Sequence, residues 1–126
     1  MTSKTSTGKN LKTKADFEKA IISHLKELGT YKKQYEEIID IYAGLLHQYQ
    51  HFEKEFEDSG YKIEEEYTNK AGATNMRKVP LYTAMESLRK DLASYSDRLG
   101  LNPKSLESIT AEKTETSRLE KALMEL

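Results

Sequence analysis

The sequence predicts a mainly α-helical fold: a small helical bundle with a long central helix, a possible short β-hairpin at about residues 61–79, and a C-terminal helical segment. Over three long stretches, apolar residues recur every three or four positions, which is the period of an amphipathic helix. Charged residues make up 33% of the chain and apolar residues 37%. This mixture suits helices with wide solvated faces better than a thick sheet sandwich.

Length, cysteine content and hydropathy exclude several classes of protein, among them disulfide-rich and membrane-spanning proteins. The 126 residues suffice for one domain with a modest core. The absence of cysteine excludes a disulfide framework and a thiolate metal site, and it fits a reducing cytoplasm. The polar start predicts no secretory signal. The longest apolar run, residues 41–46, is far shorter than the roughly 20 residues that span a membrane, so no membrane partner is expected.

Charge is distributed unevenly along the chain. Residues 1–15 contain four lysines and no acidic residue, whereas the remaining 111 residues contain 16 basic and 21 acidic side chains. Because the start of the chain also lacks periodicity, we predict a disordered basic arm at residues 1–14. Its lysines would neutralise nucleic-acid phosphates, and a solubilising tail that binds nothing is the alternative. These lysines are Lys4, Lys9, Lys12 and Lys14.

Two amphipathic helices are predicted in the first half of the chain. The first begins near Asp16 and ends at Gly29 and Thr30, with apolar residues Phe17, Ala20, Ile21, Leu25 and Leu28. The second runs from about Tyr31 to Glu57, with an aromatic-rich stripe of Tyr31, Tyr35, Ile38, Tyr42, Leu45, Tyr49, Phe52 and Phe56. At roughly 40 Å, this helix offers more apolar surface than one short partner covers. We therefore predict a contact between copies of the chain at Tyr35, Tyr42, Tyr49, Phe52 and Phe56.

The middle of the chain interrupts the helical pattern. Residues 61–67 alternate in polarity, and residues 68–75 are rich in turn formers. A hairpin that pairs roughly 61–67 with 73–79 is predicted, and a polar loop is the alternative.

A third helix is predicted to start at Pro80 and to bury Leu81, Met85, Leu88, Leu92, Tyr95 and Leu99. Gly100 is well placed as a left-handed residue after its end, and Leu101 can pack back on the last turn. Asn102 then caps a new helix with Pro103 at its first position. The chain is expected to turn a corner there, so that Leu106 and Ile109 fold back on the body. After a polar, mobile stretch, a short amphipathic helix follows, with Leu119, Ala122, Leu123 and Leu126.

No pattern in the sequence indicates catalysis. There is no Gly-rich phosphate loop, and the carboxylates lie mostly on predicted solvated faces. His47, His51 and Glu55 have the spacing of a helical metal clamp. They lie opposite the apolar stripe, however, where polar residues are expected in any case, so an enzyme that uses them ranks last among the hypotheses. No metal and no cofactor are predicted, and the residues alone indicate an oligomeric binding protein.

Three stretches of the chain resemble the phage terminase small subunit family. The first, "LRKDLASYSDRLGLNPKSLESI", has the Leu-Gly-Leu corner of the family followed by Asn-Pro, at Leu99, Gly100, Leu101, Asn102, Pro103, Ser105 and Leu106. The second, "IIDIYAGLLHQY", is similar to the central helix of the family, with its Tyr-Ala pair at Tyr42 and Ala43. The third, residues 59–80, resembles a variable insert. Val79 stands where Asn is usual before Pro80, and Leu106-Glu107 follows Ser105 where an arginine is usual, so no role of that arginine is carried over.

The resemblance covers roughly residues 15–110 and implies a non-enzymatic role. Such subunits form rings, recognise double-stranded viral DNA in the host bacterial cytoplasm, and deliver it to a large subunit that carries the ATPase and the nuclease. Residues 15–110 would form the helical core and oligomerisation domain, and residues 111–126 a C-terminal amphipathic segment. A helical protein–protein adaptor that never binds DNA is the alternative.

Together, the residues and the resemblance predict how the chain contacts DNA, other copies of itself and the large subunit. DNA is contacted by Lys4, Lys9, Lys12, Lys14, Lys26, Lys32 and Lys33. The chain forms a closed ring of more than four copies. The large subunit docks on Leu119, Leu123 and Leu126, although packing of this segment on its own ring is equally compatible with the pattern.

Overall fold

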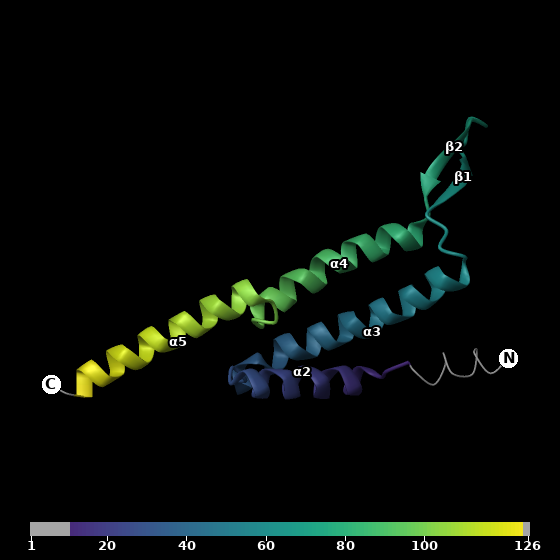
Figure 1. Ribbon diagram of the computed structural model, residues 1–126. Helices are drawn as coiled ribbons and strands as arrows, with labels where there is room; N and C mark the ends of the chain where they lie inside the picture. The colour runs from purple at the N-terminus through teal and green to yellow at the C-terminus, as the bar shows by residue number, and fades with distance from the viewer. Residues whose placement is uncertain (1–10, 125–126) are drawn as a thin grey trace.

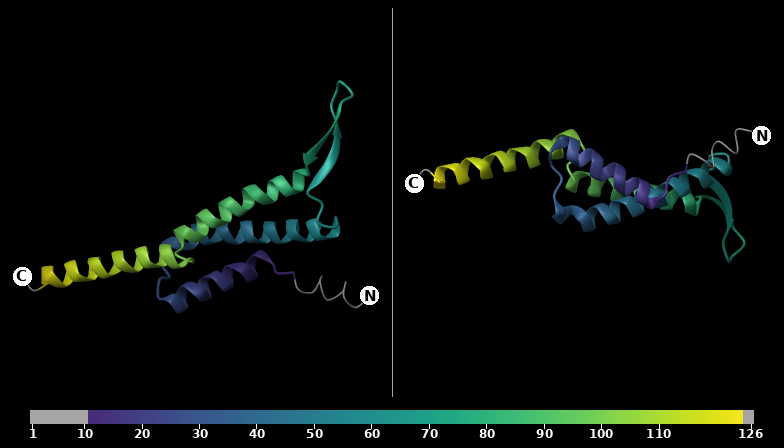
Figure 2. Two further views of the ribbon diagram at one scale, coloured as in Figure 1. Left: turned by 45° about the horizontal axis from the view of Figure 1, so that its top comes forward. Right: turned by 90° about the horizontal axis from the view of Figure 1, so that it is seen from below.

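The structure is a computed structural model that describes residues 11–124, and it confirms a mainly α-helical chain (Figure 1). Its elements, in order, are α2 (Lys14–Leu28), the short 3-10 helix η1 (Lys33–Tyr35), α3 (Glu36–Asp58), β1 (Glu64–Thr68), β2 (Thr74–Lys78), α4 (Pro80–Arg98) and α5 (Pro103–Met124). Helix α3 lies between α2 and α4. The hairpin extends from one end of this bundle and α5 from the other (Figures 1 and 2).

Local hydrogen bonds define both ends of α2. At the start, the Thr13 hydroxyl accepts from the Asp16 backbone N–H at 3.2 Å, and the Asp16 carboxylate accepts from the Thr13 N–H at 3.0 Å. This capping box confirms Asp16 as a first-turn acid. At the end, Gly29 has a φ of +73°, and the Thr30 N–H donates to the Leu25 carbonyl at 3.0 Å. Gly29 therefore closes α2 as the sequence predicts.

The core forms where α2 and the end of α4 meet α3. Its most buried side chains are Ile21, Leu25, Ile39, Ala43 and Leu99, and Met85 and Leu88 of α4 are also buried. The predicted stripe of α4 is therefore correct at its centre. Sequence analysis did not place Ile39 and Ala43 in the core, because it assigned the central helix one apolar stripe that omits both residues. In the structure α3 is covered from two sides: Asp40 and Gln50 contact the start of α2, while Tyr49 contacts α4.

The central helix starts later than predicted. Lys32 has an extended backbone, with φ of −138° and ψ of 143°, and η1 intervenes before α3 begins at Glu36. The left-handed Gly29 turns the chain out of α2, so the next residues have to cross to α3 before a new helix can start. Helix α3 thus has 23 residues, about 35 Å of helix.

The predicted hairpin is present. Strands β1 and β2 pair antiparallel, with Glu64 opposite Lys78 and Thr68 opposite Thr74. In the connecting turn, the Asn69 side-chain oxygen accepts from the N–H groups of Ala71 and Ala73, both at 3.0 Å. The hairpin is therefore stabilised by its own turn, as the Asn and Gly content of the turn indicates.

The predicted corner after α4 is confirmed. Gly100 has a φ of +68°, and the Leu101 N–H donates to the Ser96 carbonyl at 3.0 Å. The Asn102 side-chain oxygen then accepts from the Ser105 N–H at 2.9 Å and caps α5, whose first residue is Pro103. A Cβ placed on Gly100 would lie 2.7 Å from the Ile109 Cδ1 atom, so the first turns of α5 pack closely on the corner.

The prediction for the rest of the C-terminal segment was wrong. A polar, mobile stretch was expected before a short helix, whereas α5 is one helix of 22 residues from Pro103 to Met124. No glycine or proline follows Pro103, and Ala, Glu and Lys favour a helix even where no apolar stripe is present. Beyond Ile109 the helix does not fold back but runs away from the bundle (Figure 2).

Candidate nucleic-acid interface

Helix α2 carries lysines on the face that points away from the bundle. Ile21 and Leu25 are buried against α3, and at 100° per residue Lys19, Ser23 and Lys26 lie on the opposite side of the helix. Both lysines are exposed. Lys12, seven residues before Lys19, precedes the helix. We call Lys12, Lys19 and Lys26 the basic row.

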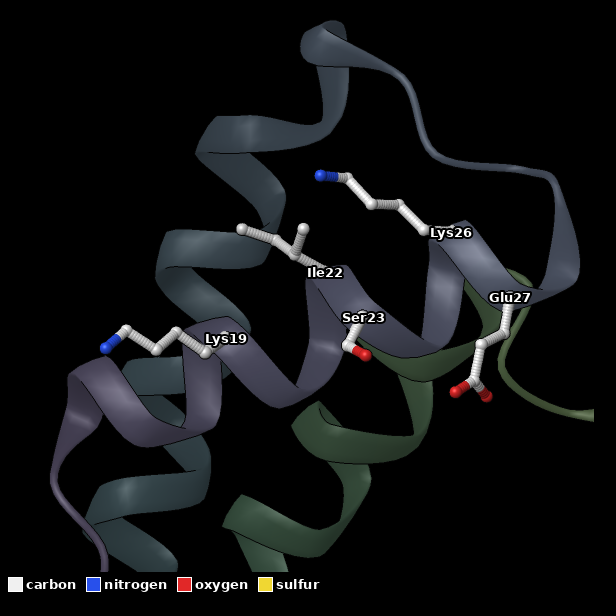
Figure 3. A pocket seen from close by; sticks show the side chains of 5 residues that line it. All are labelled: Lys19, Ile22, Ser23, Lys26 and Glu27. Carbon is white, nitrogen blue, oxygen red and sulfur yellow. The ribbon is translucent and has the colours of Figure 1, made fainter.

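An open hollow lies between the two helical members of the basic row. It has a volume of about 550 Å³ and is lined by Lys19, Ile22, Ser23, Lys26 and Glu27. Figure 3 shows Ser23 between the two lysines, with Glu27 on the C-terminal side. Two cations and one hydroxyl are groups that bind phosphate oxygens, whereas the Glu27 carboxylate repels them.

Lys12 is attached to α3 through its backbone. Its N–H donates to the Gln50 side-chain oxygen at 2.9 Å, and the Gln50 amide nitrogen donates to the Lys12 carbonyl at 2.8 Å. The Lys12 ammonium lies 6.0 Å from the centre of the Phe17 ring. The point where the basic arm joins the bundle is therefore fixed, while Lys4 and Lys9 lie outside the described residues.

Lys14 differs from the basic row because it faces α3. Its ammonium lies 2.7 Å from the Asp40 carboxylate. The hydrogen bond from Lys14 lowers the pKa of Asp40 below its usual value, and the same bond raises the pKa of Lys14. Part of the Lys14 charge is thus compensated within the chain.

The connection from α2 to α3 gathers the remaining predicted lysines. The Lys26 ammonium lies 5.3 Å from the centre of the Tyr31 ring, and the Lys32 ammonium lies 6.0 Å from that of Tyr35. Lys33 begins η1 and is exposed, as are Lys26 and Lys32. This end of α2 therefore presents three exposed cations, two of them over half-buried aromatic rings.

Lys19 is a candidate DNA-contact residue that sequence analysis missed. A signal was present, because lysine recurs every seven residues at Lys12, Lys19, Lys26 and Lys33. Seven residues are nearly two helical turns, so this spacing places Lys19 and Lys26 in line on α2. The repeat is less apparent than the acid-free first 15 residues, because Asp16 and Glu18 precede Lys19.

The residues predicted to contact other copies are half-buried within their own chain. The Tyr49 hydroxyl accepts a 2.6 Å hydrogen bond from Arg89 of α4, and the Phe56 ring lies 5.5 Å from that of Tyr82. Tyr35 and Tyr42 border the buried core, and Phe52 is partly exposed. The stripe thus packs partly against α4, and its role between copies stays a prediction.

The predicted docking residues lie near the free end of α5. Leu119 is 66% exposed and Leu123 is 70% exposed, so the bundle covers neither side chain. Leu126 lies outside the described residues. The exposed apolar stripe agrees with a docking role, which stays a prediction.

The structure brings no further metal ligand to His47, His51 and Glu55 in the part of the chain that it describes. The rings of His47 and His51 pack edge to face with centroids 4.7 Å apart. Among residues 11–124, apart from the side chains of residue 108 and residues 111–117, no three His, Asp or Glu side chains are grouped as a metal ion would require. In the same range, every helix is too short or too polar to cross a membrane.

Comparison with known protein families gives a match to most of the chain. The family model described as phage terminase, small subunit, matches residues 14–116, which is most of the chain. No curated protein and no solved structure matches the chain significantly. The matched range includes the bundle, the hairpin and most of α5.

Proposed function

The chain belongs to the phage terminase small subunit family, and from this premise we propose that it recognises double-stranded viral DNA and delivers it to the large terminase subunit. The family acts in the packaging of phage DNA, and its small subunits are generally not catalytic. The large subunit would then supply the ATPase and the nuclease, and the complex would work in the cytoplasm of the host bacterium.

The observation that carries the proposal is the family match over residues 14–116. The lysines add support from electrostatics. Exposed cations occur along the outer face of α2 and at both of its ends, and the basic arm precedes them. Cations of this kind bind the phosphate backbone whatever the base sequence, and they supply much of the affinity of DNA-binding proteins.

We propose that three parts of the chain have different binding roles. The basic arm, residues 1–14, and the lysines near α2 contact DNA. The helical core, residues 15–110, holds the copies together in a ring. The C-terminal segment, residues 111–126, contacts the large subunit through Leu119, Leu123 and Leu126. The long apolar α3 supports the second assignment, and the exposed stripe of α5 supports the third.

The salt dependence of DNA binding tests the proposal. Removing residues 1–10 deletes Lys4 and Lys9 but keeps the Thr13 cap and the Gln50 contact, so the bundle stays intact. Each lost phosphate contact flattens the slope of log K against log salt by about 0.9, so the deletion should flatten it by up to about 2. A chain that lacks residues 1–3, and so keeps both lysines, is the control.

Two outcomes would contradict the proposal. A full chain that does not bind double-stranded DNA even at low salt would favour the adaptor without DNA binding. Binding with no salt dependence would exclude phosphate contacts as its source.

A further inference from the structure

We propose that the outer face of α2 is a phosphate-contact site for DNA, in which the basic row of Lys12, Lys19 and Lys26 binds backbone phosphates and Ser23 donates a hydroxyl hydrogen bond. This inference rests on the proposed DNA binding and adds a defined surface to it. Lys19, Ser23 and Gln50 are the residues that it adds.

The orientation of α2 makes this face available. The opposite face of the helix is covered by α3 through Ile21 and Leu25. Lys19, Ser23 and Lys26 are exposed on the side of α2 away from Ile21 and Leu25 (Figure 3). The Lys26 ammonium reaches back to within 5.3 Å of the centre of the Tyr31 ring. Because the hollow between the lysines is open, phosphates can approach the ammonium groups and the hydroxyl from solvent.

The spacing of the row suits contact with more than one phosphate of a strand. Lys19 and Lys26 are seven residues apart, which is about 10.5 Å along a helix. Each lysine side chain is long and flexible, so the two ammonium groups can each reach a different phosphate of a strand that lies across this face.

Two acidic residues lie beside the basic row, so this face of α2 is not uniformly positive. Asp16 lies near both Lys12 and Lys19, and its carboxylate accepts the Thr13 N–H. This hydrogen bond, followed by that of the Thr13 hydroxyl, lowers the pKa of Asp16, and the two lysines lower it further. Glu27 borders the hollow with no ion pair among the described contacts. It would oppose a phosphate there, so its neutralisation should strengthen binding.

Gln50 has a positioning role in this site. Lys12 precedes the first helical residue, so helix geometry does not fix its place. The two hydrogen bonds between the Gln50 amide and the Lys12 backbone, 2.9 and 2.8 Å long, fix it instead. Without them Lys12 would move with the basic arm and lose its alignment with Lys19.

Measurement of DNA affinity across a salt series tests the site. Lys19→Ala should flatten the slope of log K against log salt by about 0.9, which reduces the affinity lost between 50 and 200 mM salt by about threefold. Glu27→Gln should raise the affinity. Lys90→Ala, which removes an exposed lysine of α4, is the matched control and should change neither quantity.

A double-mutant cycle tests the positioning role of Gln50. Gln50→Ala should flatten the slope in the full chain but not in a chain that already carries Lys12→Ala, because Gln50 acts through Lys12. Gln48→Ala, on the exposed side of the same helix, is the control. Equal effects of Gln50→Ala in both backgrounds would overturn this role.

Different results would contradict this inference and the proposed function. If removal of residues 1–10 flattens the slope and Lys19→Ala does not, the α2 site is wrong and DNA binding by the arm stands. If the full chain does not bind DNA, both proposals fail. Circular dichroism of each variant shows whether the fold is kept.

Discussion

Two glycines of this chain have the same backbone conformation in different surroundings. Gly29 ends α2 with a φ of +73°, and Gly100 follows α4 with a φ of +68°. A Cβ on Gly29 would have no neighbour within 4 Å, whereas a Cβ on Gly100 would lie 2.7 Å from the Ile109 Cδ1 atom. Comparison of the two sites therefore separates the cost of the left-handed backbone from the cost of packing against α5.

Substitution of both glycines should give unequal losses of stability. Gly29→Ala should cost about 1–2 kcal/mol, the usual penalty of a left-handed backbone for a residue with a Cβ. Gly100→Ala should cost more because Ile109 also has to move, and Gly100→Val should cost more again. Thermal or urea denaturation measures these free energies of unfolding.

Ile109→Ala, combined with Gly100→Ala, is the control because it removes the obstructing methyl group. It should make the cost of Gly100→Ala similar to that of Gly29→Ala. If the two alanine substitutions cost the same in the original chain, the close contact between the corner and α5 is not present in solution.

At single residues, the sequence predicts helix ends better than it predicts contacts. Asp16, Gly29, Gly100 and Asn102 were identified because caps and left-handed turns depend on neighbours a few residues away. The pairing of Gln50 with the Lys12 backbone spans 38 residues, and no local pattern encodes it. The same reason explains why the ion pair between Lys14 and Asp40 was not foreseen.

At the scale of elements, helices α4 and α3 show where apolar periodicity predicts the buried residues correctly and where it does not. The stripe of α4 identified Met85 and Leu88 correctly, because α4 faces the bundle on one side only. Helix α3 contacts both α2 and α4, so its buried Ile39 and Ala43 lie outside a single stripe. Polarity alone suggested a linker in the middle of α5, from about residue 111, although Ala, Glu and Lys favour a helix there even without an apolar stripe.

Truncation after Ile109 tests the role of α5. The truncated chain keeps Leu106 and Ile109 at the corner and loses the exposed Leu119 and Leu123. We expect the oligomer to stay assembled, because its proposed contacts lie in residues 15–110. Stimulation of the large subunit's ATPase should be lost, because the proposed docking stripe is gone.

A double substitution in the full chain, Leu119→Ser with Leu123→Ser, is the matched control, because it removes the apolar stripe and keeps the length of the chain. It should reproduce the loss of ATPase stimulation. Loss of the oligomer itself on truncation would instead place α5 in the contact between copies.

At the scale of the whole molecule, one copy leaves much apolar surface uncovered. The hairpin and α5 extend from opposite ends of the bundle (Figure 2), and exposed apolar side chains occur on both. They include Ile63, Tyr67, Met76, Leu119 and Leu123. The aromatic stripe of α3 is only half-buried. A small domain with this much exposed apolar surface is expected to associate with partners, including further copies of itself.

The mass of the assembled protein tests the central claim, that this chain is a ring-forming, DNA-recognising subunit. Native mass spectrometry at micromolar concentration, with and without double-stranded viral DNA, gives both the copy number and the bound DNA. We expect a closed homo-oligomer of more than four copies that gains the mass of the DNA at low salt and loses it as salt increases. A monomer under both conditions, with no DNA bound, would contradict the account.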